Sequence, residues 1–130
     1  AAISDLNALL RALDPVLDPE PYAFVELSDD DPRTGVAVAI VREAEGLGGI
    51  VPLASAHDPE GSAAFVAARI TLQVHSDLAA VGLTATVATA LAERDVPCNV
   101  VAGLRHDHLF VPWDARERAL RALIALIPSD

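Results

Sequence analysis

The stretch ITLQVHSDLAAVGLTATVATALAERDVPCNVVAGLRHDHLFVP, residues 70–112, decides the fold that we predict for this chain. Its first residues belong to a strand expected at residues 69–75. Ile70, Leu72 and Val74 should point to one side of that strand and the polar residues between them to the other, because side chains alternate across a strand. This alternation predicts a strand with one buried face.

A helix and two further strands are expected after this first strand. Ser76 and Asp77 can open the helix, which is predicted to run through residues 78–95 with a buried apolar stripe. The segments VPCNVVAG (96–103) and HLFVP (108–112) are typical of strands, and the turn LRHD joins them. The stretch is therefore predicted to end in a hairpin.

A last helix is predicted over residues 115–127, with Asp114 as its N-cap. From residue 69 the order is then strand, helix, strand, strand, helix, which is a ferredoxin-like βαββαβ unit without its final strand. A sheet that lacks a strand exposes an edge that must be paired or covered. The N-terminal strands can supply that strand, so we expect two halves that complete each other.

The N-terminal half is expected to contain one helix and an antiparallel meander. Ser4 can cap a helix in SDLNALLRAL (4–13), and the prolines of DPVLDPEP (14–21) should end that helix. The Gly-rich segment AEGLGG (44–49) is predicted to be a turn. Three strands are predicted, at residues 22–28, 36–43 and 50–53.

The breaker-rich segment SAHDPEGSA (55–63) is the best candidate for a boundary between the halves. The length of 130 residues suits one compact domain, or two small ones that share a core. We therefore predict an α+β chain with an N-terminal half at residues 1–64 and a C-terminal half at residues 65–130.

The composition limits the partners and the location of the protein. With 19 acidic and 9 basic residues the formal net charge is −10, which argues against binding to nucleic acid or to an anionic membrane surface. No apolar run approaches the ~20 residues that span a bilayer, and the N-terminus lacks the pattern of a signal peptide. Cys98 is the only cysteine, so we expect a reducing, cytoplasmic location.

Residues 70–112 resemble the core of small, stand-alone bacterial ACT-domain proteins. The resemblance is carried by VHSDL, AVGLTA, CNVVA and HDHLFVP, and more loosely by the N-terminal YAFVEL and REAEGLGGIVPL. It implies two ACT-like halves related to the tandem regulatory domains of aspartokinases, here without an attached catalytic domain. It also implies a regulatory module that binds an amino acid at the interface of a domain pair, and hence a homo-oligomer.

The motif His106-Asp107-His108 has three interpretations. Two histidines that lie two residues apart on a strand face the same side and could bind one metal ion, but His57 and Cys98 are poorly placed as further ligands. A catalytic base with an orienting carboxylate, or a contact to a ligand or partner, is the second interpretation. We favour the third, a hairpin tip, with His106 and Asp107 in the turn and His108 at the start of the return strand.

The loop HSDLAAVGL, between the first strand and the helix, is the expected ligand site. Free N–H groups at the helix N-terminus would hold a carboxylate, and Asp77 would face an ammonium group. Gly82, expected early in the helix, would let the ligand approach the backbone, and Asn99 would fix its orientation. The predicted binding residues are Ser76, Asp77, Val81, Gly82, Asn99 and Val100. Plain helix capping and tight packing explain the same residues without a ligand.

The sequence contains no convincing catalytic constellation. Cys98 lies in a strand that is expected to be buried, where a lone cysteine behaves as a small hydrophobe. Ser76 and His75 are adjacent, which points them to opposite faces of a strand. We therefore predict a non-catalytic regulatory or sensor protein without a cofactor or metal. The alternatives are a structural or protein-interaction module, and a small His-dependent enzyme or metal protein.

Overall fold

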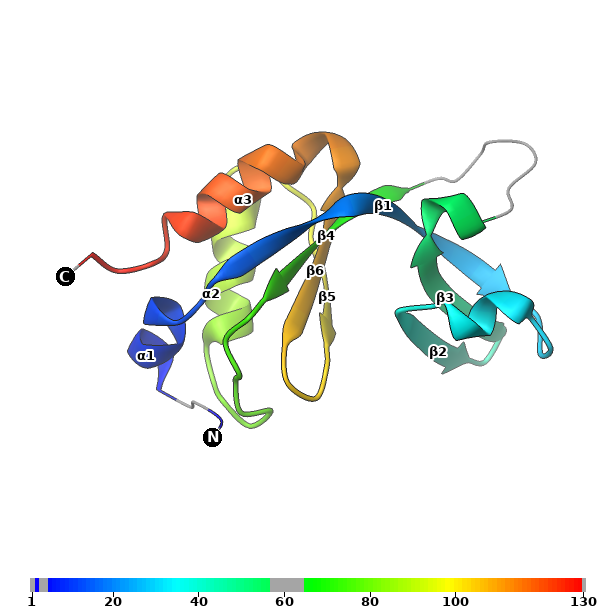
Figure 1. The fold of residues 1–130 in the computed structure, drawn as a ribbon. Helices are drawn as coiled ribbons and strands as arrows, with labels where there is room; N and C mark the ends of the chain where they lie inside the picture. Colours follow the sequence, from blue (N-terminus) through cyan, green and yellow to red (C-terminus); the bar gives the residue numbers. More distant parts are fainter. Residues whose placement is uncertain (1, 3–4, 57–64, 130) are drawn as a thin grey trace. The chain divides into compact units, whose positions relative to one another are not determined.

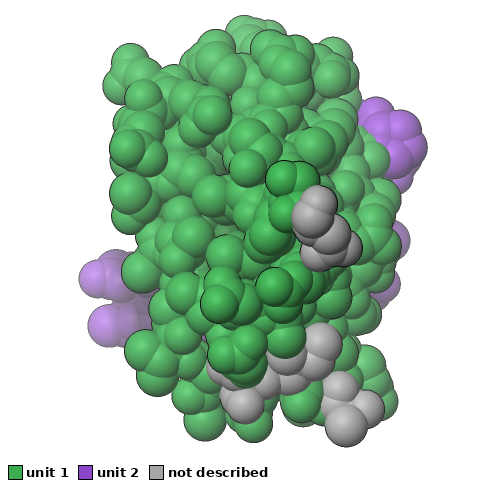
Figure 2. All heavy atoms as spheres, turned by 90° about the vertical axis from the view of Figure 1, so that its left-hand side faces the viewer, with its two compact units in different colours: residues 1–18, 68–130 green, residues 19–67 purple. Residues whose placement is uncertain are grey.

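The computed structural model describes residues 2, 5–56 and 65–129, and these form two compact units (Figure 1). Unit 1 comprises residues 1–18 and 68–130, and unit 2 comprises residues 19–67; Figure 2 colours them separately. Most of the predicted boundary segment, residues 57–63, lies outside the described residues. Strands β1 (Pro15–Leu27) and β4 (Val66–Leu72) each begin in one unit and end in the other.

Unit 1 contains the βαββα segment that the sequence predicts, with an N-terminal strand added. Its strand order is β1-β4-β6-β5, so the N-terminal strand β1 lies next to β4. This is the place of the final strand of a ferredoxin-like unit, and the expected origin of the missing strand is therefore confirmed. The remaining elements of the unit are α1 (Leu6–Arg11), α2 (Leu83–Ala92), β5 (Asn99–Ala102), β6 (Asp107–Pro112), η3 (Trp113–Ala115) and α3 (Arg116–Ile124).

The N-terminal segment is bound to unit 1 by backbone hydrogen bonds and by apolar packing. The N–H of Gln73 donates to the carbonyl of Asp14 (3.1 Å), and the N–H of Val74 donates to that of Leu13 (3.4 Å). Leu9 and Leu13 are fully buried in the core that α2 and α3 share with the sheet. A helix of six residues is marginal alone, so this burial stabilises α1.

The core of unit 1 lies between the sheet and the helices α2 and α3, which lie side by side in Figure 1. The predicted alternation of burial is confirmed, because Ile70, Leu72 and Val74 are buried while Gln73 and His75 are exposed. The predicted bounds of the strand, residues 69–75, are wrong, because β4 begins at Val66 and ends at Leu72. Small side chains on α3 let its backbone approach the core closely. The helix residues buried there are Leu83, Val87, Ala90 and Leu91 of α2 and Ala119, Ala122 and Leu123 of α3.

The predicted starts of two helices are wrong. Helix α2 begins at Leu83 and not near residue 78, so Gly82 precedes the helix and is its N-cap. Helix α3 begins at Arg116 with Ala115 as N-cap, and no side chain in the described part of the chain caps it. Asp114 lies instead in η3, the single 3-10 turn that follows β6 and delays the start of α3. In α1 the N-cap is Asp5, whose carboxylate accepts from the N–H of Ala8 (3.1 Å); Ser4, the predicted N-cap, lies outside the described residues.

Unit 2 is an antiparallel sheet in the order β2-β3-β1, connected by single 3-10 turns where unit 1 has helices. Its elements besides β1 and β4 are η1 (Pro32–Gly35), β2 (Ala39–Glu43), β3 (Gly46–Pro52) and η2 (Leu53–Ser55). The segment AEGLGG, predicted to be a turn, turns only at residues 44–45, and its glycines belong to β3. Cross-strand pairing on both sides of β3 has overridden the low strand propensity of glycine.

Helix α1 ends before the prolines of residues 14–21, as predicted, and strand β1 then runs through these prolines. Pro15, Pro19 and Pro21 are separated by even numbers of positions along the strand. Their missing N–H groups therefore all lie on the same side of it. Strand β3 pairs with β1 only from Tyr22 to Leu27, beyond these prolines. A strand can therefore pass through all three without losing a hydrogen bond to β3.

Asp31 and Arg33 hold the turn η1 in place. The Asp31 carboxylate accepts from the N–H groups of Ser28 (3.1 Å) and Arg33 (3.0 Å) and forms an ion pair with the Arg33 side chain (2.8 Å). Arg33 in turn donates to the carbonyls of Ala56 (2.6 Å) and Glu26 (3.0 Å). The pair thus connects η1 to β1 and to the segment after η2, around the small core of Ala23, Val51 and Ala56.

We predict that this pair makes unit 2 sensitive to acid. Hydrogen bonds from the Arg33 side chain and backbone hold the pKa of Asp31 well below its usual range. A lowered carboxylate pKa stabilises the folded state above about pH 4, and that contribution is lost as the pH falls further. Asp31→Asn should lower the melting temperature at about pH 7 and flatten its decline between about pH 5 and 2. The exposed neighbour Asp29→Asn is the control; an equal effect of both variants would contradict this role.

Candidate functional site

Four of the six predicted binding residues lie in the loop between β4 and α2. The Ser76 hydroxyl donates to the carboxylate of Asp107 (3.4 Å), which ties the loop to β6. Asp77 forms a tight turn, because its carboxylate accepts from the N–H of Ala79 (2.8 Å) and its carbonyl accepts from that of Ala80 (2.9 Å). Val81 is 85% exposed. The Asp77 carboxylate therefore has a local partner but remains open to solvent.

Gly82 directs the chain into α2 with a left-handed backbone. Its φ is +105°, a conformation that other residues rarely adopt, and a Cβ there would lie 3.4 Å from a methyl carbon of Leu6. Within the described part of the chain, no side chain caps the first turn of α2. The N-terminal N–H groups of this helix and the positive end of its dipole therefore keep their capacity to bind an anion.

The two predicted residues of β5 point in opposite directions. Val100 packs against the core and lines a crevice that also involves Thr84 of α2 and Asp107 of β6. This crevice is too narrow to admit a water molecule. Asn99 is exposed on the other face of β5. Val100 and Asp107 thus lie near the first turn of α2, and Ser76 lies near it as well because it is hydrogen-bonded to Asp107. Asn99 points away from this turn.

The hairpin interpretation of His106-Asp107-His108 is confirmed. Strands β5 and β6 pair antiparallel with Ala102 opposite Asp107, and the N–H of Gly103 donates to the carbonyl of His106 (2.9 Å) across the turn. Strand β6 begins at Asp107, one residue earlier than predicted. In the described ranges, no group of three or more histidine, cysteine, aspartate or glutamate residues is arranged to hold a metal ion.

His108 has a structural environment in the sheet. Its Nδ1 lies 3.1 Å from the Thr71 hydroxyl and 3.2 Å from a guanidinium nitrogen of Arg69. Because a guanidinium can only donate, Nδ1 must accept, and the ring proton is then on Nε2. Burial, followed by the charge of Arg69, lowers the pKa of His108, which favours the neutral ring. The nitrogen that faces Arg69 therefore has no lone pair left for a metal.

Cys98 is half-buried just before β5, and burial raises the pKa of its thiol to about 11. The thiolate is the nucleophilic form, so this cysteine is almost wholly protonated and unreactive at neutral pH. The environment of Cys98 is therefore that of a packing residue.

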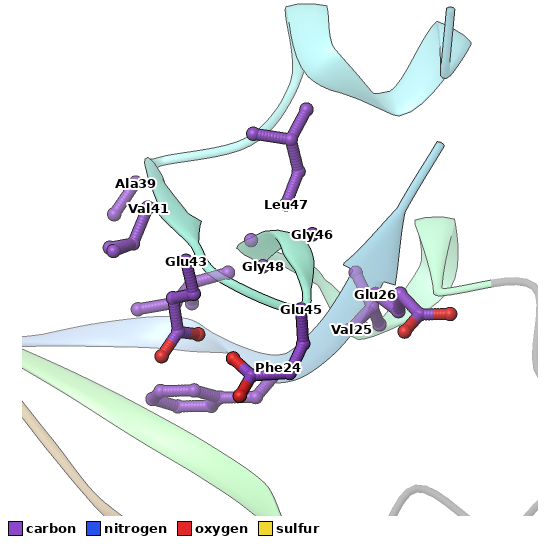
Figure 3. Close-up of a pocket in the computed structure, with 12 residues that line it drawn as sticks. Phe24, Val25, Glu26, Ala39, Val41, Glu43, Glu45, Gly46, Leu47 and Gly48 are labelled. Atoms are coloured by element: carbon purple, nitrogen blue, oxygen red, sulfur yellow. The ribbon is translucent and has the colours of Figure 1, made fainter. Parts of the chain in front are cut away.

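Unit 2 contains a hollow of about 480 Å³ that sequence reasoning did not find (Figure 3). Strand β3 forms its floor, and side chains of β1 and β2 form its walls, among them Phe24, Val41 and Glu43. The residues that form the hollow lie in YAFVEL and EGLGG, but the sequence alone does not reveal it. Only the strand register shows that the glycines of β3 lie between the side chains of β1 and those of β2.

Two family models match the chain, one in each half. One ACT-domain family model matches residues 1–68, and a second matches residues 68–125. No curated protein matches the chain. None of the helices in the described ranges is long and apolar enough to cross a membrane.

Solved structures have folds similar to that of this chain. A protein of unknown function from Vibrio cholerae, described as a possible transport protein, is 36% identical over 95% of this chain and 96% of its own, with a TM-score of 0.81. The ligand-free regulatory subunit of aspartate kinase from Thermus thermophilus is 12% identical over 91% of this chain and 99% of its own (TM-score 0.64). Aspartate kinase from Clostridium acetobutylicum is 8% identical over 87% of this chain and 34% of its own (TM-score 0.64). With two matched domains and a ferredoxin-like fold, this chain belongs to the ACT-domain family.

Proposed function

We propose that this ACT-domain protein is a non-catalytic regulatory module that binds an amino acid or a similar small zwitterion at the loop between β4 and α2. The observation that carries the proposal is the start of α2 at Gly82, where a left-handed glycine leaves the first-turn N–H groups without a side-chain cap from the described residues. Such a helix start suits a carboxylate. The family supports a regulatory role, because ACT domains are generally regulatory modules. We also propose that the chain consists of two ACT-like repeats, residues 1–64 and residues 65–130.

The remaining contacts of the ligand would come from Asp77 and Asn99. The exposed Asp77 carboxylate would face the ammonium group, because its bond to the N–H of Ala79 occupies only part of its accepting capacity. Asn99 would contribute an amide that can both donate and accept. Since Asn99 and Val100 lie on opposite faces of β5, one ligand cannot use both side chains within a single chain.

A second copy of the chain could supply the Asn99 side chain that cannot reach the loop within one chain. Strand β5 is the last strand in the order of unit 1, so its outer edge has no neighbour among the described strands. Two large apolar side chains of the loop, Leu78 (66% exposed) and Val81 (85% exposed), are also available for burial. We propose a homo-oligomer in which Asn99 of one copy approaches the loop of another. The same features support the alternative of a protein-interaction module without a ligand.

Thermal unfolding in the presence of each of the twenty amino acids separates these two functions. We expect at least one of them to raise the melting temperature, since a ligand at 100 times its Kd adds ~2.7 kcal/mol to stability. Asp77→Asn keeps an oxygen for the Ala79 N–H but loses the charge, and Asn99→Ala removes an exposed amide. Both variants should keep the apo melting temperature and lose the ligand-induced shift, while Asp29→Asn in unit 2 should keep both. An unchanged shift in both site variants would exclude this loop.

The proposal of a non-catalytic protein predicts an inert thiol. Because burial raises the pKa of Cys98 to about 11, the folded protein should react with a thiol reagent at about pH 7.5 roughly ten- to a hundredfold more slowly than the denatured chain. A lone, protonated thiol also fits the reducing cytoplasm that we propose as its location. Rapid and stoichiometric labelling of the folded protein would show that the Cys98 thiol is reactive, and it would contradict the proposal of a non-catalytic cysteine.

A further inference from the structure

The hollow in unit 2 results from glycines in the middle of a three-stranded sheet. Strand β3 lies between β1 and β2, and its register places Gly48 opposite Glu26 on one side and Val41 on the other. Residues paired in this way point to the same face of a sheet. Because Gly46 and Gly48 carry no side chain, the middle strand leaves a groove between the side chains of its neighbours.

The groove face is apolar and open. Phe24 is 43% exposed and Val41 is 57% exposed, whereas Ala23 and Val51, which point to the opposite face, are fully buried. The volume of about 480 Å³ is within the range of sites for small molecules. This face therefore has both the space and the apolar surface that a small ligand requires.

The charges around the groove all have one sign. Glu26, Glu43 and Glu45 contribute carboxylates, and none of the described residues that line the groove is basic. Figure 3 shows the Glu43 and Glu45 carboxylates on the same side of the hollow as the Phe24 ring. The Glu43 carboxylate also leans over the floor, since a Cβ placed on Gly48 would lie 3.5 Å from it. Arg42 is paired with Leu47 and belongs to the other face.

We propose that this groove binds a small organic amine that has an apolar body and no carboxylate. The ammonium group would lie between the Glu43 and Glu45 carboxylates, and the apolar body would cover Phe24 and Val41. An amino acid would bring a carboxylate among like charges, so it would be disfavoured in this groove. The site is separate from the loop before α2, and it does not depend on the function proposed for that loop.

Other occupants fit the groove less well. A metal ion would leave the apolar walls unused, and the described residues offer no three-residue metal cluster. A second copy docked by the same face would bring two acidic grooves together, in a chain whose formal net charge is already −10. Charge complementarity therefore favours an amine.

The test compares three matched probes on the full chain, with nuclear magnetic resonance to locate binding and calorimetry to measure it. The probes are phenethylamine, phenylalanine, which adds a carboxylate, and 2-phenylethanol, which replaces the ammonium with a neutral hydroxyl. We expect phenethylamine to shift the amides of Gly46, Gly48 and Phe24, and to bind at least about tenfold more tightly than the other two. Added salt should weaken its binding.

Variants connect the binding to the groove. The double change Glu43→Gln with Glu45→Gln keeps the volume and should weaken phenethylamine at least about tenfold. Gly48→Leu should fill the floor and abolish binding, and Glu93→Gln at the C-cap of α2 should have no effect. The Gln variants need no change in packing, so they test the proposal even if Gly48→Leu does not fold. Equal affinity for the three probes, no binding of phenethylamine, unchanged affinity in the double variant, or shifts confined to residues 76–82 would each overturn the proposal.

Discussion

Unit 1 depends on the pairing of the N-terminal strand with β4, because a βαββα segment alone forms a sheet that lacks one strand. The hydrogen bonds from Gln73 and Val74 to the carbonyls of Asp14 and Leu13 begin this pairing, and the fully buried Leu13 places an apolar side chain in the core at the same point. The segment also reaches the proposed ligand site, since Leu6 of α1 lies against Gly82. One interaction thus completes the sheet and supports the start of α2.

Glycine serves two different purposes in the two units. Gly82 is needed for its backbone, because its φ of +105° turns the chain into α2 and leaves the helix N-terminus available to an anion. Gly46 and Gly48 matter for the side chains that they lack, because they leave a groove between two lines of side chains on a sheet. The first arrangement favours a ligand carboxylate, and the second, lined by glutamates, favours an ammonium group. The two sites that we propose therefore call for ligand groups of opposite charge.

The sequence predicts the fold well where a single period governs burial. The alternation of Ile70, Leu72 and Val74 and the strand–helix–strand–strand–helix order needed no tertiary information. The start of α2 was not predictable in this way, because residues 78–82 continue an apolar pattern while Asp77 and Gly82 impose a turn. The groove was not predictable because glycines in a strand carry no periodic signal, and only the register with β1 and β2 makes them a floor.

Native-state hydrogen exchange at the amides of Gln73 and Val74 tests the central claim most directly, because their acceptors belong to the N-terminal segment. If that segment is an integral part of unit 1, both amides should exchange only through the global unfolding that also exposes Leu109 in β6. Their free energies of opening should then agree with that of Leu109. Exchange of Gln73 and Val74 about a hundredfold or more faster than Leu109, with the rest of unit 1 still protected, would show that the N-terminal strand detaches alone and would contradict this account.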